Sequence, residues 1–312
     1  MGTAALKLPS GENANLVLVR AGPRSLHHHW LSQPGRPQNF DLVALAYGPT
    51  PLALDRGDFG HVDVPGAKVA GYGAFLREHR DFVQRYARVA LIDDDVRADS
   101  HTLSRCFDLG ESLGLSLWQP SLTWDSYTSY ITLLRHPGLT PARYVNFVEM
   151  MCPFFKTEAL LEVEDLFRLG AETGIDVIWS AILGQEPRRL AVLDGASVKH
   201  TAPVGRLMAM NGFDPDEGYE AKIEELVRLF AIEFPGCVGL GPSGRFTFLD
   251  RIVSLAQLAC VAAAALRTPL YKREFWGRWR GDVRRQTLAP PVIKGDPRRL
   301  LSLAMSRAAH LA

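Results

Sequence analysis

Three consecutive carboxylates, Asp93, Asp94 and Asp95, stand directly after the apolar run at residues 89–92. Carboxylates this close repel one another, so a fold keeps them where water solvates them, where they cap a backbone, or where they share a cation. Hard divalent cations such as Mn²⁺ and Mg²⁺ bind carboxylate oxygens and leave positions for substrate phosphates. In an extended segment Asp93 and Asp95 point to one side as metal ligands, and Asp94 points to the other, toward sugar or ribose hydroxyls. The ordinary alternative is a solvated turn or a helix N-cap.

Cationic side chains elsewhere in the sequence could bind a diphosphate. Arg20 and Arg24 leave the first predicted strand, and guanidinium groups bind phosphate oxygens through paired hydrogen bonds. Lys68 lies in a loop between Gly66 and Gly71 that could close over phosphates. The alternative is that all three are ordinary surface residues.

Glu149 is a candidate general base. It stands among Val148, Met150 and Met151. Burial in such surroundings would raise the pKa of its carboxyl group, as a base that works near neutral pH requires. A purely structural hydrogen bond is the competing interpretation.

The elements that must position these residues alternate between apolar strands and amphipathic helices. Strand, helix, strand is the repeating unit of a mostly parallel sheet, and ligands bind outside the carboxyl ends of such strands. The acidic triplet stands at one such end. Tyr, Thr and Ile in residues 127–134 favour an edge strand. We expect strands at 15–19, 40–46, 89–92, 115–118 and 189–193, and helices at 72–86, 100–113 with Ser100 as the cap, 157–169, 174–183, 217–234 and 248–266.

Composition divides the chain of 312 residues into three parts. Residues 1–14 are expected to be a loose leader, 15–205 an α/β catalytic domain, and 206–312 a helical, basic appendage. From residue 267 onward there are 11 Lys and Arg against three acids, whereas the whole chain has a net charge of +1. Such a split indicates that the tail faces an anionic partner, or that its arginines pair with the acidic body.

Several classes of protein are disfavoured by what the sequence lacks. The four cysteines are far apart, with no CxxC pair, so neither a zinc site nor a disulfide framework is indicated. No apolar run reaches the length of a membrane-spanning helix. We therefore expect a cytoplasmic protein, with peripheral membrane contact through the tail as an option and no nucleic-acid partner. The GxxxxGK[ST] loop of P-loop enzymes is also missing.

Four segments in order carry a family resemblance that covers about residues 15–205. Residues 86–96 resemble Tyr-x-x-Val-x-Leu-x-Asp-Asp-Asp-Ile, Gln119-Pro120-Ser-Leu resembles Gln-Pro-Ala-Leu, and residues 147–155 resemble Val-Glu-Met-Met-Ala-Pro-Val-Phe. Residues 25–30 with 40–48 are similar to the opening of the same family. The acidic element looks like the DxD motif of GT-A glycosyltransferases. More closely, the chain resembles a plant and bacterial family of unknown function that is regarded as glycosyltransferase-like.

This resemblance implies a Rossmann-like GT-A fold, a Mn²⁺ or Mg²⁺ ion and a nucleotide-sugar donor, with a UDP-sugar preferred. It implies that His200, after the last core strand, completes a metal site with Asp93 and Asp95. Tyr47 and Gln119 fall in matched segments, so they are expected at the donor together with Asp94. Asp176, at a helix start, resembles the acid that inverting GT-A enzymes present to the acceptor hydroxyl. A helix-start aspartate favoured by the helix dipole is its ordinary alternative.

The function predicted is transfer of a sugar to a hydroxyl on a carbohydrate or lipid-linked acceptor, with inversion, in cell-surface polysaccharide or glycolipid synthesis. Asp176 is the first candidate base and Glu149 the second. Two other functions remain open at this point. One is a metal-dependent nucleotidyltransferase or phosphotransferase that uses the same triplet. The other is a non-catalytic carbohydrate-binding protein with the same fold.

Overall fold

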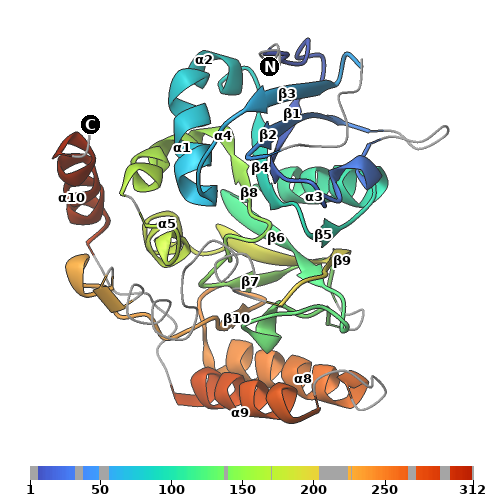
Figure 1. Cartoon of the computed structure of the whole chain (residues 1–312). Helices are drawn as coiled ribbons and strands as arrows, with labels where there is room; N and C mark the ends of the chain where they lie inside the picture. Colours follow the sequence, from blue (N-terminus) through green and yellow to red (C-terminus); the bar gives the residue numbers. More distant parts are fainter. Residues whose placement is uncertain are drawn as a thin grey trace.

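A computed structural model describes residues 6–31, 38–48, 56–136, 140–169, 171–203, 224–225, 227–265, 272–288 and 296–310. Figure 1 shows a central sheet with α1 and α5 on one side and α3 on the other. The strands are β1 Asn15–Ala21, β2 Phe40–Ala46, β3 Phe59–Asp63, β4 Arg88–Asp93, β5 Val96–Arg97, β6 Leu117–Leu122, β7 Arg143–Val145, β8 Phe154–Lys156, β9 Leu190–His200 and β10 Gly239–Gly241. The helices are α1 Lys68–Glu78, α2 Arg80–Val83, α3 Ser100–Ser112, α4 Thr157–Glu162, α5 Ile175–Leu183, α8 Phe248–Ala265, α9 Lys272–Leu288 and α10 Pro297–His310, with short 3₁₀ turns η1 His27–His29, η2 Ile131–Leu133 and η3 Glu164–Arg168.

The sheet is mostly parallel, as the sequence predicts. Its order is β10-β7-β9-β6-β8-β4-β1-β2-β3. The long pairings, β1 with β2 and β4, β2 with β3, and β6 with β9, are parallel. Of the described strands on this path, only β7 and β8 run against the others. The carboxyl ends of β1, β2, β4, β6 and β9 therefore lie along one edge of the sheet.

The central strands contain apolar runs, at residues 16–19 and 42–46, that place apolar side chains on both faces of the sheet. Every residue of β1 and of β2 is buried, as expected where helices cover both faces of a parallel sheet. Helix α3 packs closely on this core because Gly110 has no side chain. A Cβ atom on Gly110 would lie 2.2 Å from the ring of Trp118, whose indole N–H donates to the carbonyl of Cys106 at 3.0 Å.

The predicted cap of α3 is wrong by one residue. Helix α3 does begin at Ser100, but its N-cap is Asp99, whose carboxylate accepts the backbone N–H of Thr102 at 2.8 Å. The predicted helices at 72–86 and 157–169 are each broken into two shorter elements, the first at His79 and the second at Val163.

The edge strand predicted at 127–134 does not form. Residues 131–133 are a 3₁₀ turn instead. The backbone N–H and the hydroxyl of Thr132 both donate to the carboxylate of Asp282, at 3.0 and 3.2 Å. A tertiary contact with a distant helix thus overrides local strand propensity.

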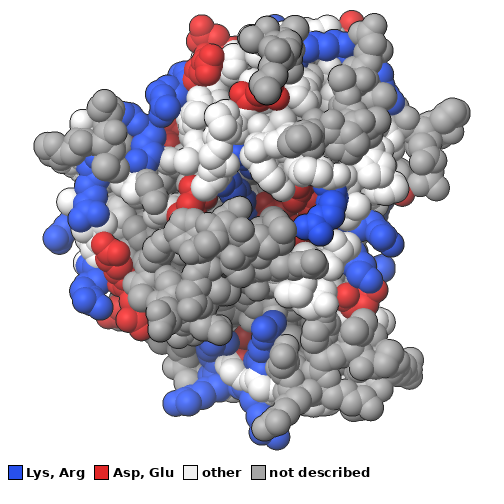
Figure 2. Space-filling model, viewed as in Figure 1, with Lys and Arg blue, Asp and Glu red and all other residues white. Residues whose placement is uncertain are grey.

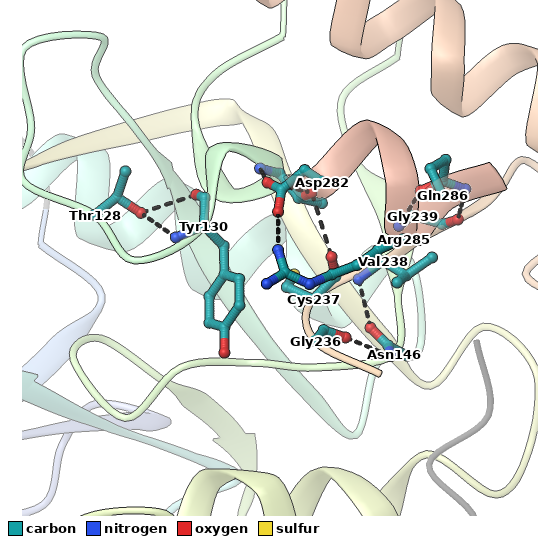
Figure 3. Close-up of polar contacts among 11 residues, drawn as sticks. Thr128, Tyr130, Asn146, Gly236, Cys237, Val238, Gly239, Asp282, Arg285 and Gln286 are labelled. Atoms are coloured by element: carbon teal, nitrogen blue, oxygen red, sulfur yellow. Dashed lines mark hydrogen bonds and ion pairs between the residues drawn. The ribbon is translucent and has the colours of Figure 1, made fainter. Parts of the chain in front are cut away.

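Residues beyond 205 add to the same sheet. Strand β10 pairs with β7, and Figure 1 shows α8 and α9 packed below it. Figure 3 shows the polar contacts that fix α9 there. Gln286 donates to the carbonyl of Gly239 at 2.8 Å and accepts its N–H at 3.0 Å. Within α9, Arg285 donates to the buried Asp282 at 2.8 Å. The boundary near 205 stays a prediction. Of the helix predicted at 217–234, residues 217–223 and 226 lie outside the described residues; residues 224–225 and 227–229 are helical, and residues 230–234 are not.

Replacing Asp282 with alanine is expected to lower the free energy of unfolding by about 1–3 kcal/mol, because the buried N–H of Thr132 loses its acceptor. Urea unfolding followed by circular dichroism measures this. Glu158, whose side chain is exposed and pairs with Lys156 at 2.6 Å, is the matched control, since a surface ion pair is worth about 0–1 kcal/mol. Equal effects of Asp282→Ala and Glu158→Ala would contradict the anchoring role.

Candidate functional site

The acidic triplet lies where the sequence predicts it, at the carboxyl end of β4. Asp93 is the last residue of that strand, and Asp94 and Asp95 form a turn before β5, so the segment is not extended as expected. The backbone N–H of Asp93 donates to the carbonyl of Met151 at 2.9 Å. This bond holds the segment that carries Glu149 beside the triplet. Figure 2 shows acidic and basic side chains meeting in a recess near the middle of one face of the molecule.

Lys68 forms an ion pair with the carboxylate of Asp93. It is the first residue of α1, and its ammonium lies 2.5 Å from one oxygen of Asp93 and donates to the carbonyl of Met150 at 2.8 Å. Burial raises the pKa of Asp93 to about 6, although the neighbouring Lys68 opposes that rise. The contact ties α1, β4 and the segment before β8 together, and it places a cation at the site.

Glu172 positions Lys68, and the sequence analysis did not find it. Its carboxylate accepts the backbone N–H groups of Val69 and Ala70 at 2.7 and 3.0 Å. A carboxylate at a helix N-terminus is stabilised by the helix dipole and by these free donors. No local pattern reveals the pairing, because the two partners are about a hundred positions apart in the chain.

Asp94 is turned toward the ends of β1 and β2. It accepts the backbone N–H of Gly22 at 3.1 Å and the hydroxyl of Tyr47 at 2.9 Å. Tyr47 remains 40% exposed, so its ring is open to a ligand. Burial raises the pKa of the Tyr47 hydroxyl above its usual range, and the Asp94 carboxylate raises it further. The predicted contact of Asp94 with sugar or ribose hydroxyls therefore competes with two contacts that it already makes.

Asp95 and His200 lie together. The Nε2 atom of His200 is 3.4 Å from an Asp95 carboxylate oxygen, because Val96 pairs with His200 between β5 and β9. His200 is the last residue of β9 rather than a residue beyond it. Its Nδ1 donates to the carbonyl of Tyr127 at 3.0 Å, which leaves Nε2 toward Asp95. The other Asp95 oxygen, Oδ1, is buried and has no hydrogen-bond partner.

Glu149 and Asp176 form a buried carboxyl pair next to Lys68. Burial raises the pKa of Glu149 to about 7, and the charge of Asp176 adds to the rise. Burial also raises the pKa of Asp176 to about 6. Asp176 accepts the backbone N–H of Met150 at 3.3 Å, whereas the Oε2 atom of Glu149 is buried without a partner.

Gln119 lies under Glu149 in β6. Its side-chain oxygen accepts the backbone N–H of Glu149 at 2.8 Å, and its Nε2 is buried without a hydrogen-bond partner. The residue therefore belongs to the site, and β6 continues through Gln119 and Pro120 instead of ending before them as expected.

The two predicted arginines differ in position. Arg20 is buried, and its guanidinium donates to the carbonyls of Val64 and Gly66 at 2.7 and 2.6 Å, so its contacts hold the chain that leads into α1. Arg24 is exposed. A diphosphate contact is thus sterically open to Arg24, whereas Arg20 is committed to the backbone.

The three predicted metal ligands do not form a ready-made site. Within the described residues, no group of three or more His, Cys, Asp or Glu side chains is arranged to hold an ion. Asp95 and His200 meet, but Asp93 is paired with Lys68. Two protein ligands still suffice for a hard cation that takes its remaining oxygens from water and phosphate.

The chain is loosely similar to several solved structures. A mannosyltransferase from Pyrobaculum calidifontis, solved with GDP-Man and Mn²⁺, has a TM-score of 0.38 at 13% identity, over 97% of this chain and 77% of its own. TarS from S. aureus has 0.41 at 14%, over 95% and 53%, and its 1–349 fragment with UDP has 0.38 at 12%, over 88% and 90%. No family model matches the sequence, and no curated protein matches it. The narrower family resemblance of residues 15–205 therefore stays a prediction.

Proposed function

We propose that the chain is a metal-dependent glycosyltransferase that uses a nucleotide-sugar donor. The observation that carries the proposal is the pairing of Asp95 and His200 at the carboxyl edge of the sheet, where a buried Asp95 oxygen has no partner. An orphaned, buried carboxylate oxygen is costly unless a cation or donor satisfies it. A bound Mn²⁺ or Mg²⁺ would remove that cost.

The chemistry of this pair suits a divalent ion. Histidines that ligate a metal commonly donate their other ring N–H to a backbone carbonyl, as His200 does to Tyr127. Asp95 and the Nε2 of His200 would hold the ion, and the donor diphosphate and water would supply further oxygens. The ion would neutralise the negative charge that develops on the diphosphate as the sugar leaves.

Lys68 and Tyr47 complete the proposed donor site. The ammonium of Lys68 is partly exposed and lies against Asp93, so a phosphate oxygen can approach it from the open side. Tyr47 offers an exposed ring beside the ends of β1 and β2. Arg24 would bind the diphosphate at the rim. Asp93 then keeps Lys68 in place instead of ligating the metal directly.

The carboxyl pair supplies the proposed general base. Its contacts favour Glu149 over Asp176 for this step, because Glu149 Oε2 is free of partners and Asp176 is held by a backbone N–H. Asp176 would position the 149–151 segment and, by its charge, raise the pKa of Glu149. A base that activates an acceptor hydroxyl for direct displacement gives inversion at the anomeric carbon. A carbohydrate or lipid-linked acceptor in cell-surface polysaccharide or glycolipid synthesis fits this reaction.

The first expected result is that nucleoside diphosphates and nucleotide sugars, UDP-sugars first, raise the melting temperature only when Mn²⁺ or Mg²⁺ is present. The physical reason is that a diphosphate and several carboxylates repel one another unless a cation bridges them. Thermal shift with a donor panel measures binding, and release of nucleoside diphosphate measures donor hydrolysis.

The same assay separates the competing functions. Nucleotide binding that EDTA leaves unchanged would contradict the metal-dependent site. Turnover of nucleoside triphosphates with no use of sugar donors would indicate a nucleotidyltransferase or phosphotransferase. Binding of sugars without any nucleotide binding would indicate a carbohydrate-binding protein.

A further inference from the structure

The outward face of α8 is apolar along its whole described length. Its exposed residues are Phe248, Leu249, Ile252, Ala256, Ala259, Cys260 and Ala263, spaced three and four apart as one helix face requires. Phe248, Leu249 and Ile252 are 79%, 67% and 48% exposed. No charged side chain interrupts this face between 248 and 263.

The inward face of α8 carries polar residues beside the apolar Leu258, Val261 and Ala262. Asp250, Ser254 and Gln257 are buried. The carboxylate of Asp250 accepts the N–H and the hydroxyl of Thr247 at 2.8 and 2.7 Å. The Asp250 contacts cap the start of the helix itself, whereas the hydroxyl of Ser254 donates to the carbonyl of Gly239 in β10 at 3.4 Å and so ties the inward side of α8 to the sheet.

On helix α9, an acidic side chain is buried and several arginines are exposed. Of its two acids, Asp282 is buried against Thr132, whereas Arg278, Arg280 and Arg284 are exposed. Trp279 packs toward α8 and donates to the carbonyl of Leu258 at 3.0 Å, so its indole joins the two helices. Phe275 lies where side chains are not described.

The two helices lie side by side at one end of the molecule. Both helices contact each other and cover the β10 end of the sheet, and the anchors shown in Figure 3 fix α9 there. Figure 2 shows basic side chains gathered at that end of the molecule. Apolar residues bordered by arginines, with Asp250 and Asp282 turned inward, form a surface that we call the α8–α9 face.

We propose that the α8–α9 face docks on an anionic lipid membrane and lies in its interface. Helices of this kind bind by burying apolar side chains at the boundary between headgroups and acyl chains, and nearby arginines add electrostatic attraction. Among the described helices, none is both long and apolar enough to cross a bilayer. A second copy of the chain fits less well, because a face-to-face pair would bring two sets of exposed arginines together.

Cys260 provides a reporter in the middle of this face. It is exposed, whereas Cys106, Cys152 and Cys237 are buried. Under native conditions a thiol reagent should therefore react at Cys260 alone. Vesicles of phosphatidylcholine with phosphatidylglycerol are expected to slow the alkylation of Cys260 and to carry the full chain into the pellet, whereas vesicles of phosphatidylcholine alone do neither.

Substitutions test which side chains carry the binding. Ile252→Glu and Leu249→Glu are each expected to weaken sedimentation with anionic vesicles about tenfold or more, and Arg280→Gln and Arg284→Gln about fivefold each. Met305→Glu is the matched control, because Met305 is 58% exposed on α10, and it should leave binding unchanged. Circular dichroism and urea unfolding of each variant show whether the fold is intact, independently of any donor.

Three results would overturn the proposal. The first is equal binding to neutral and anionic vesicles. The second is an unchanged alkylation rate of Cys260 when anionic vesicles are added. The third is protection of Cys260 without lipid, together with a concentration-dependent dimer in analytical ultracentrifugation, which would assign the face to a second copy of the chain.

Discussion

Asp95→Asn is expected to abolish the metal-dependent binding of the donor and to lower kcat/KM by at least about 100-fold. A metal that stabilises the leaving diphosphate is worth several kcal/mol, and roughly 2.7 kcal/mol corresponds to 100-fold. The amide keeps the size of the carboxylate but loses its charge. Isothermal titration of nucleoside diphosphate, with and without Mn²⁺, measures the effect.

Asp99→Asn is the matched control for that substitution. Asp99 is four positions away and caps α3, and asparagine caps helices about as well as aspartate. The Asp99 variant should therefore bind donor as the wild type does. If Asp95→Asn binds donor normally in the presence of Mn²⁺, the Asp95–His200 pair is not the metal site.

The strands that could be predicted are those that contain an uninterrupted apolar run, as at residues 16–19, 42–46 and 89–92. β1, β2 and β4 belong to this group, and their expected positions are confirmed to within two residues. β3 was missed because Gly60 and His61 interrupt its apolar run. β7, β8 and β10 are too short to show a period, and they exist because longer strands offer them partners. Local pattern cannot reveal pairing of that kind.

The types of residue in the candidate site could be predicted from the sequence, but the contacts between them could not. The triplet was recognisable because three acids follow a buried strand. The pairing of Lys68 with Asp93 was not, because it depends on Glu172 and on the carbonyl of Met150. The orientation of His200 likewise depends on a backbone carbonyl far away in the sequence.

The apolar face of α8 is a further feature that the sequence alone does not reveal. Its spacing can be read from the sequence, but an apolar stripe on a helix normally indicates the side that faces the core. Only the burial of each residue shows that Leu258 and Val261 face the core while Phe248, Leu249 and Ile252 are exposed.

Glu149→Gln is expected to lower kcat about 10²- to 10⁴-fold, the usual contribution of a general base. Glutamine keeps the shape of the side chain but cannot take a proton. Because burial raises the pKa of Glu149 to about 7, the rate of the wild type should rise with pH through that range and then level off. Donor affinity should change little, since Asp95 and His200 are unaltered.

Asp176→Asn separates catalysis from positioning. Removing the negative charge of Asp176 lowers the pKa of Glu149, so the rising limb of the pH profile should move to lower pH while kcat at high pH stays within about tenfold of the wild type. Loss of nearly all activity at every pH in Asp176→Asn, with Glu149→Gln still active, would assign the base to Asp176 instead.

Stability gives an independent check on the same pair. A carboxyl whose pKa is raised in the folded state binds its proton more tightly there, so its contribution to stability is complete below the pKa of the unfolded chain and is lost as the pH rises through about 7. Glu149→Gln should therefore stabilise the protein relative to the wild type at pH 8 and much less at pH 4, with urea unfolding at the two pH values as the measurement. If Glu149 is a buried, functional carboxylate, Glu149→Gln should lower activity and raise stability at pH 8. If Glu149 is purely structural, the substitution should lower both activity and stability.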